Sequence, residues 1–132
     1  MNYNFDTKAS GKVTMHTAVL LDLDWPSKGA REGGHNQRIH WMIMNIKDNR
    51  IDTGAVVFSY LQCAPYYNSG PHRFVFLIYE QEGYIDVKNL PFDTSERNCP
   101  EGIMTRARVL RLGTPVVSIC LLTHVCMRRN YT

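Results

Sequence analysis

The sequence predicts a mainly β fold, organised as an antiparallel β-sandwich with one or two short peripheral helices. Its apolar segments are short, rich in Val, Ile, Met and Phe, and separated by clusters of Gly, Pro, Asn and Asp, which is typical of strands joined by turns. Two segments, 39–46 and 74–79, are apolar on both alternating faces, so we expect them to be covered on both sides. Two such central strands imply layers that pack against each other.

The individual elements follow from the apolar segments and the turn residues between them. Strands are expected near residues 13–21, 39–46, 54–60, 73–80 and 115–125. The best helix candidate is 101–111, because Pro100 precedes it and Gly113 follows it in the order that helix ends favour. The loops 22–38 and 61–71 are long and contain Pro and Gly, and loops of such length commonly carry function.

Length and composition indicate one globular domain spanning residues 1–132. The chain has 44% hydrophobic and 20% charged residues, the ordinary globular range. Its net charge of +3 is spread along the sequence, whereas nucleic-acid binding usually needs a basic face, so no nucleic-acid partner is expected for a free protein. The cysteines are expected to be reduced thiols and no metal or other cofactor is expected, because no cysteine pair has the close spacing of zinc sites: Cys63, Cys99, Cys120 and Cys126.

The N-terminal sequence predicts a cytoplasmic protein. Its first fifteen residues lack the apolar core of a signal peptide and the Arg-rich amphipathic character of a transit peptide. No apolar run approaches the length of about 20 residues that spans a membrane.

Four polar residues stand at the expected mouths of strands. Asp22 and Asp24 follow the first strand, His40 opens the second, and His72 opens the fourth. Two imidazoles can donate N–H bonds to a phosphate-type anion, and a carboxylate such as Asp22 can orient one of them. The alternative is that each histidine is a hydrogen-bonded core residue and each aspartate a turn former. A divalent metal held by the four side chains is a third interpretation.

Strand alternation predicts where the two imidazoles point. By parity, His72 shares a face with Phe74 and Phe76, and His40 shares one with Met42 and Met44. Each ring would then stand at the rim of an apolar layer, which suits a half-buried pocket.

Several short motifs, in the same order and with similar spacing, resemble those of the phosphatidylethanolamine-binding protein family and cover roughly residues 12–86. The run Asp22-Leu23-Asp24-Trp25-Pro26-Ser27 resembles its DPDAPS motif, and Gly70-Pro71-His72-Arg73-Phe74-Val75-Phe76 resembles its G-x-H-R-Y-V-F motif. His40-Trp41 followed by Asn45-Ile46 resembles its HW and N-I element, and Tyr79-Glu80-Gln81 its Y-x-Q ending. Tyr60 and Pro65 fall where the family has its Tyr and its Pro-rich pocket loop.

This resemblance implies a Greek-key β-sandwich with a small pocket for phosphate, sulfate, acetate or a phospholipid head group. The implied ligand-binding residues are Asp22, Asp24, Pro26, His40, Tyr60, Pro65, Gly70, His72 and Phe74. The family further implies a cis bond before Pro26, no enzymatic activity, and regulation through protein partners such as kinases or proteases. Peripheral contact with a membrane is compatible with this function.

The departures from the family pattern support a second hypothesis. Trp25 and Phe74 replace the family's Ala and Tyr, and we expect no counterpart to the first strands and the C-terminal helix of the family. Segment 40–86 is also similar to the family-related protein of the mitochondrial large ribosomal subunit. The alternative function is therefore a mitochondrial, structural subunit of a large assembly, with a vestigial pocket.

Overall fold

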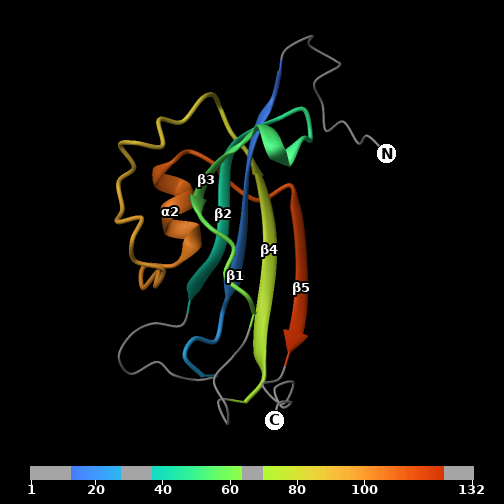
Figure 1. The fold of residues 1–132 in the computed structure, drawn as a ribbon, viewed down its shortest axis with the longest axis vertical. Helices are drawn as coiled ribbons and strands as arrows, with labels where there is room; N and C mark the ends of the chain where they lie inside the picture. Colours follow the sequence, from blue (N-terminus) through green and yellow to red (C-terminus); the bar gives the residue numbers. More distant parts are fainter. Residues whose placement is uncertain (1–12, 28–36, 64–69, 124–132) are drawn as a thin grey trace.

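The computed structural model describes residues 13–27, 37–63 and 70–123, and its main element is one antiparallel sheet (Figure 1). The five strands lie in the order β3-β2-β1-β4-β5, so β1 is the central strand. The predicted mainly β, antiparallel fold is confirmed, and each expected strand is present: β1 Met15–Asp22, β2 Arg38–Lys47, β3 Ala55–Phe58, β4 His72–Glu80 and β5 Val117–Thr123.

Two short helices complete the described part of the chain: the 3₁₀ helix η1, Ile51–Thr53, and the α-helix α2, Ile103–Val109. Helix α2 ends at Val109, two residues before the predicted end at Arg111, because Arg111 has a left-handed backbone with φ 62°. The Leu112 N–H then donates to the Ala107 carbonyl at 2.8 Å, which closes the helix end. Neither helix in the described residues has the length and apolar composition that a membrane span requires.

One face of the sheet, the covered face, carries the main core. Helix α2 and the irregular segment 81–102 lie against it beside β2 and β3 (Figure 1). In the described residues the layer on this face is therefore a helix and coil. The buried cluster joins strand and helix side chains, among them Val19, Leu21, Ile39, Met42, Met44, Val75, Leu77, Ile103 and Ala107.

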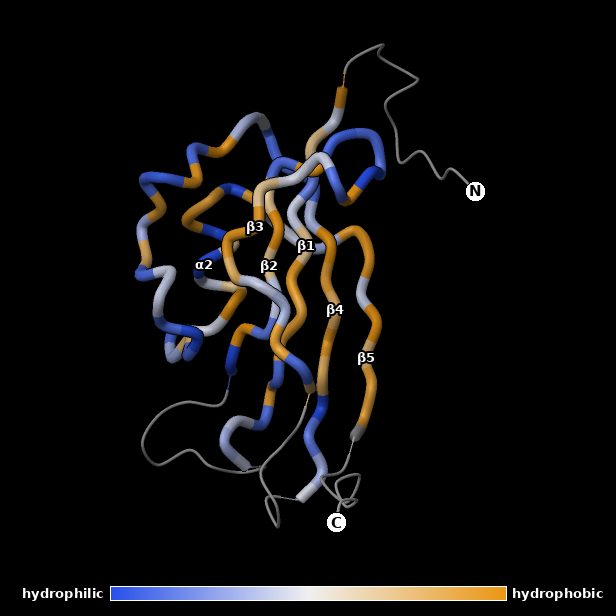
Figure 2. Tube along the Cα trace, viewed as in Figure 1, coloured by the Kyte–Doolittle hydropathy of each residue, from blue (hydrophilic) through white to orange (hydrophobic). Residues whose placement is uncertain are grey.

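The opposite face of the sheet, the second face, is also apolar but is partly accessible. Its buried residues Ala18, Ile43 and Ile46 pack with the half-buried Trp41, Phe76 and Ile78. At the sheet edges the side chains of Val56, Ile119 and Leu121 are 61%, 52% and 61% exposed. Figure 2 shows the apolar colour continuing along β4 and β5. This face therefore buries much less of its apolar surface than the covered face does.

Candidate functional site

The antiparallel topology brings three predicted site residues to one end of the sheet. Because β2 and β4 both run antiparallel to β1, their first residues lie beside the last residue of β1. Asp22 is thus directly opposite Arg38 on β2 and Phe74 on β4. Residues that face each other across antiparallel strands project to the same side of the sheet. The site therefore begins on the second face, at the mouth of β1.

Asp22 and His72 form a fully buried hydrogen-bonded pair. His72 Nδ1 lies 2.6 Å from Asp22 Oδ2, and the side chains are 0% and 1% exposed. The Asp24 backbone N–H donates to Asp22 Oδ1 at 2.8 Å. Burial raises the pKa of the Asp22 carboxyl, while the hydrogen bonds from Asp24 and His72 offset part of that rise. The carboxylate thus fixes the orientation of the His72 ring.

The position of His40 differs from the one that simple alternation predicts. Leu20 pairs with Trp41 and Leu21 with Ile39, so His40 is the extra residue of a β-bulge. The extra residue shifts the alternation of side chains along β2. His40 therefore does not lie on the covered face with Met42 and Met44, and its imidazole points to the side of Phe74. The prediction that His40 shares the face of the two methionines is wrong, because alternation assumes an uninterrupted ladder.

One ring nitrogen of His40 is satisfied and the other is not. Nδ1 lies 2.9 Å from the Leu61 carbonyl oxygen, which can only accept, so Nδ1 carries the proton. Nε2 is buried and has no hydrogen-bond partner. Burial lowers the pKa of His40, and the charges of Arg38 and Arg97 act in the same direction, against the Leu61 carbonyl and Asp22. The neutral form of the His40 ring is therefore favoured.

Phe74 spaces the two imidazoles. Its ring is edge-on to His40 with centroids 5.1 Å apart, and stacked on His72 at 6.3 Å. The predicted residues His40, His72, Phe74 and Asp22 are therefore brought together in the structure.

Asp24 anchors the chain that follows β1. The Arg73 backbone N–H and Nε donate to Asp24 Oδ2 at 2.8 and 2.9 Å, and Arg73 Nη2 donates to Oδ1 at 2.8 Å. Burial alone would raise the pKa of Asp24, but the bonds from Arg73 bring it below its usual value. Both carboxylate oxygens of Asp24 thus accept hydrogen bonds within the protein. Asp24 therefore holds the segment after β1 in place beside the site.

The remaining predicted residues take different positions. The Trp25–Pro26 peptide bond is cis. Gly70 has φ 85°, a left-handed conformation that favours glycine, two residues before His72. Tyr60 packs edge-on against Trp41 at 5.8 Å and is 59% exposed, so it lies on the second face. Pro65 lies outside the described residues.

Sequence reasoning missed three residues around His40. Arg38 lies opposite Asp22, and Arg97 Nη1 donates to the Ile39 and His40 carbonyls at 3.1 and 3.3 Å, which holds the bulge. Burial and the Asp22 charge both raise the pKa of Cys63, which places this thiol near the site. The sequence could have indicated Arg38, because it is a charged residue next to an apolar strand. It could not have indicated Arg97, which is 57 residues from His40.

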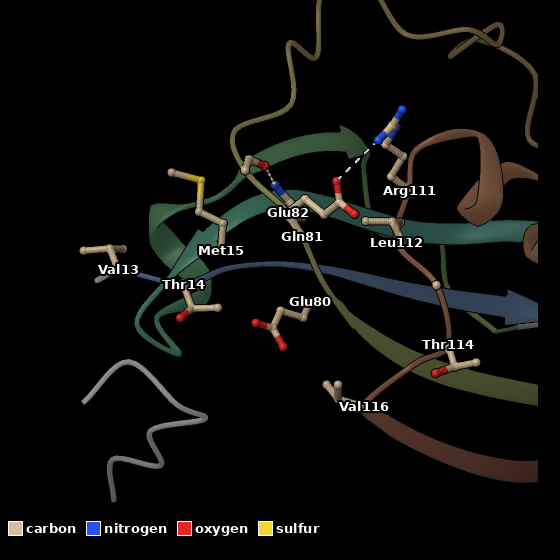
Figure 3. A pocket seen from close by; sticks show the side chains of 12 residues that line it. Val13, Thr14, Met15, Glu80, Gln81, Glu82, Arg111, Leu112, Thr114 and Val116 are labelled. Atoms are coloured by element: carbon tan, nitrogen blue, oxygen red, sulfur yellow. Dashed lines mark hydrogen bonds and ion pairs between the residues drawn. The ribbon is translucent and has the colours of Figure 1, made fainter. Parts of the chain in front are cut away.

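A surface hollow of about 600 Å³ lies at the opposite end of β1 and β4 (Figure 3). It is lined by Met15, Glu80, Glu82, Arg111 and Val116 among others, and Glu82 pairs with Arg111 at 3.8 Å. None of the predicted ligand-binding residues lines it. In the part of the chain that the structure describes, no group of three His, Cys, Asp or Glu side chains is placed to hold a metal ion.

Comparison with known proteins agrees with this architecture. A family model described as phosphatidylethanolamine-binding protein matches residues 5–114. The 26 kDa secreted antigen of Toxocara canis is 36% identical over 103 residues, which is 76% of this chain and 38% of the antigen. The chain therefore belongs to the phosphatidylethanolamine-binding protein family.

Solved structures share the fold at lower identity. The crystal structure of a carboxypeptidase Y inhibitor complexed with its cognate proteinase has a TM-score of 0.66 and 23% identity, covering 83% of this chain and 59% of that one. A phosphatidylethanolamine-binding protein from Plasmodium vivax has a TM-score of 0.59 and 15% identity, covering 78% and 60%. The chain spans less than two thirds of the length of each of these relatives.

Proposed function

We propose that this chain is a non-enzymatic module that binds a phosphate-type anion, such as a phospholipid head group, between His40 and His72, and acts through a protein partner. The observation that carries the proposal is the buried, unpartnered Nε2 of His40 beside the Asp22–His72 pair. A buried polar atom without a partner is costly, and an oxygen of a bound ligand would supply one.

The geometry favours an anion over a neutral ligand. Because Nδ1 of His40 already donates to Leu61, Nε2 can donate only when the ring is protonated. A bound anion stabilises that protonated ring, and a charge-assisted hydrogen bond results. Asp22 meanwhile keeps the His72 ring in place.

Two comparisons support the choice of partner and location. A carboxypeptidase Y inhibitor that binds its proteinase shares the fold, which supports a protein partner for this chain. The relative in Toxocara canis is named a secreted antigen, and this name favours an extracellular location over the cytoplasmic one predicted from the N-terminal sequence.

Replacing His72 with alanine is expected to weaken the binding of inorganic phosphate about ten- to a hundredfold, since one buried charge-assisted hydrogen bond contributes about 1.5 to 3 kcal/mol. Isothermal titration calorimetry on wild type and His72→Ala measures the difference. Lys88→Ala is the matched control, because it removes an exposed cation from the turn at Asp86. Equal affinities of wild type and His72→Ala would reject the pocket assignment.

The accessible second face favours a second candidate, a structural subunit of a large assembly. Exposed Ile119 and Leu121 on β5 are the kind of apolar edge that a partner covers. Size-exclusion chromatography with light scattering separates the candidates. A stable monomer supports the binding module, whereas insolubility or self-association of the chain alone supports the subunit.

A further inference from the structure

Arg38 lies within the candidate site but has no role in the proposed contacts. It begins β2 directly across from Asp22, so both side chains leave the same face of the sheet. Its positive charge acts on His40, where it disfavours protonation of the ring. Arg38 is therefore within electrostatic reach of the histidine that awaits a ligand.

The guanidinium of Arg38 is held in place but not neutralised. Its central carbon lies 4.0 Å from the centroid of the Trp25 ring, a cation–π contact that fixes the plane of the group. Its Nε is buried and has no hydrogen-bond partner. Among the described residues no carboxylate forms an ion pair with it, since Asp22 accepts from Asp24 and His72. A half-buried cation whose Nε is shielded from water and keeps an unused donor is typical of an anion site.

Arg97 is a second cation near His40, but both of its Nη groups already donate to the protein. Its Nη1 donates to two carbonyls of β2, and its Nη2 donates to the Ser59 carbonyl at 2.9 Å. Arg97 therefore contributes a fixed background charge, whereas Arg38 keeps a donor available for a ligand.

We propose that Arg38 and the Nε2 side of His40 form an anion subsite that makes the pocket select ligands with net negative charge. This inference rests on the proposed anion-binding function and names the ligand class: phosphate monoesters, either free or as the head group of an acidic lipid. A zwitterionic head group carries an ammonium as well as the phosphate. Arg38 and a protonated His40 would repel that ammonium.

The test uses two soluble ligands of opposite design. Glycerol 3-phosphate is a monoester with net negative charge, and glycerophosphoethanolamine is a zwitterionic diester. We expect wild type to prefer the monoester, and Arg38→Met to weaken monoester binding about ten- to a hundredfold while changing diester binding by less than about threefold. Methionine keeps an unbranched apolar side chain against Trp25. Arg50→Met is the matched control, because Arg50 is an exposed arginine in the turn after β2.

Each outcome decides one question. If wild type binds neither ligand, the proposed function fails. If His72→Ala weakens monoester binding but Arg38→Met does not, the pocket stands and the Arg38 subsite is overturned. Equal wild-type affinities for the two ligands also overturn it, and this measurement needs no variant to fold. Arg38→Lys should bind the monoester with intermediate affinity, since it keeps the charge and loses the planar group. Sedimentation with phosphatidic acid vesicles then tells a lipid source from a free phosphate.

Discussion

At the scale of single residues, the site depends on which hydrogen bonds are satisfied inside the protein. The carboxylate oxygens of Asp22 and Asp24 accept hydrogen bonds from donors within the protein, so these two residues orient His72 and Arg73. His40 and Arg38 keep a buried nitrogen without a partner. The sequence could identify Asp22, His40 and His72 because their types and order match the family. It also suggested that Asp22 orients an imidazole. It could not assign the roles of Asp24, His40 and Arg38, because they depend on Arg73, Leu61 and other contacts distant along the chain.

The pKa of His40 makes stability depend on pH. Burial lowers it from its ordinary value of 6.5, so the unfolded chain binds a proton on His40 at a pH where the folded chain does not. The stability contributed by neutral His40 is therefore present above about pH 6.5 and is lost as pH falls toward the folded pKa. We expect the unfolding free energy of wild type to fall more steeply between pH 7 and 5 than that of His40→Gln, by at most about 1.4 kcal/mol per pH unit.

Urea denaturation at several pH values, without added anions, measures this slope. Arg50→Gln serves as the control, because it replaces an exposed group of fixed charge. Parallel pH profiles for wild type and His40→Gln would show that burial does not shift the titration of His40.

At the scale of the elements, β-bulges in β2 explain what the strand prediction could not. The segment 39–46 was correctly predicted as a strand from its composition. Its pairing with β1 shifts register twice, once at His40 and once near Asn45, which has φ 62°. Asparagine tolerates this left-handed conformation, so Asn45 was a weak local signal of the second bulge. The bulge at His40 has no such signal, because it is held by Arg97 from another segment.

The bulge at Asn45 also ties the covering segment to the sheet. Its side chain exchanges hydrogen bonds of 2.9 Å with the Ile85 backbone, and its Oδ1 accepts from Gln81 Nε2 at 2.9 Å. Gln81 Oε1 in turn accepts from Thr17 Oγ1 at 2.7 Å. This network lies in the interior, where each lost bond leaves a buried group unsatisfied.

We expect Asn45→Ala to lower the unfolding free energy by about 2 to 4 kcal/mol, because it removes the side-chain hydrogen bonds of Asn45 to Ile85 and Gln81 and leaves alanine in a left-handed conformation. Chemical denaturation measures the change. Asn89→Ala is the control, since Asn89 is exposed and bonds only locally to Asp86 in the contacts described; we expect it to change stability by less than about 1 kcal/mol. Similar losses for both variants would contradict a structural role of the Asn45 network.

At the scale of the whole molecule, the local apolar pattern predicted the strands and the helix. Contacts between segments distant in the sequence place the layer over the covered face. The strand expected near 115–125 is Val117–Thr123, and the helix expected over 101–111 is Ile103–Val109. Short alternating apolar segments suffice for such assignments. The layer over the covered face was not predictable in detail, because segment 81–102 has no periodic pattern and is placed by Asn45, Gln81 and the core cluster.

The central position of β1 has a consequence for how the protein acquires its site. Asp22 meets His72 from 50 residues further along the chain, so the pair forms only when β4 has docked on β1. Closing so long a loop is entropically unfavourable before its contacts exist, whereas β2 lies nearer in sequence. In a chain with only β1 and β2 joined, the Asp22 carboxylate would lack its imidazole partner. The Asp22–His72 pair would therefore be absent from any refolding intermediate in which β4 has not docked on β1.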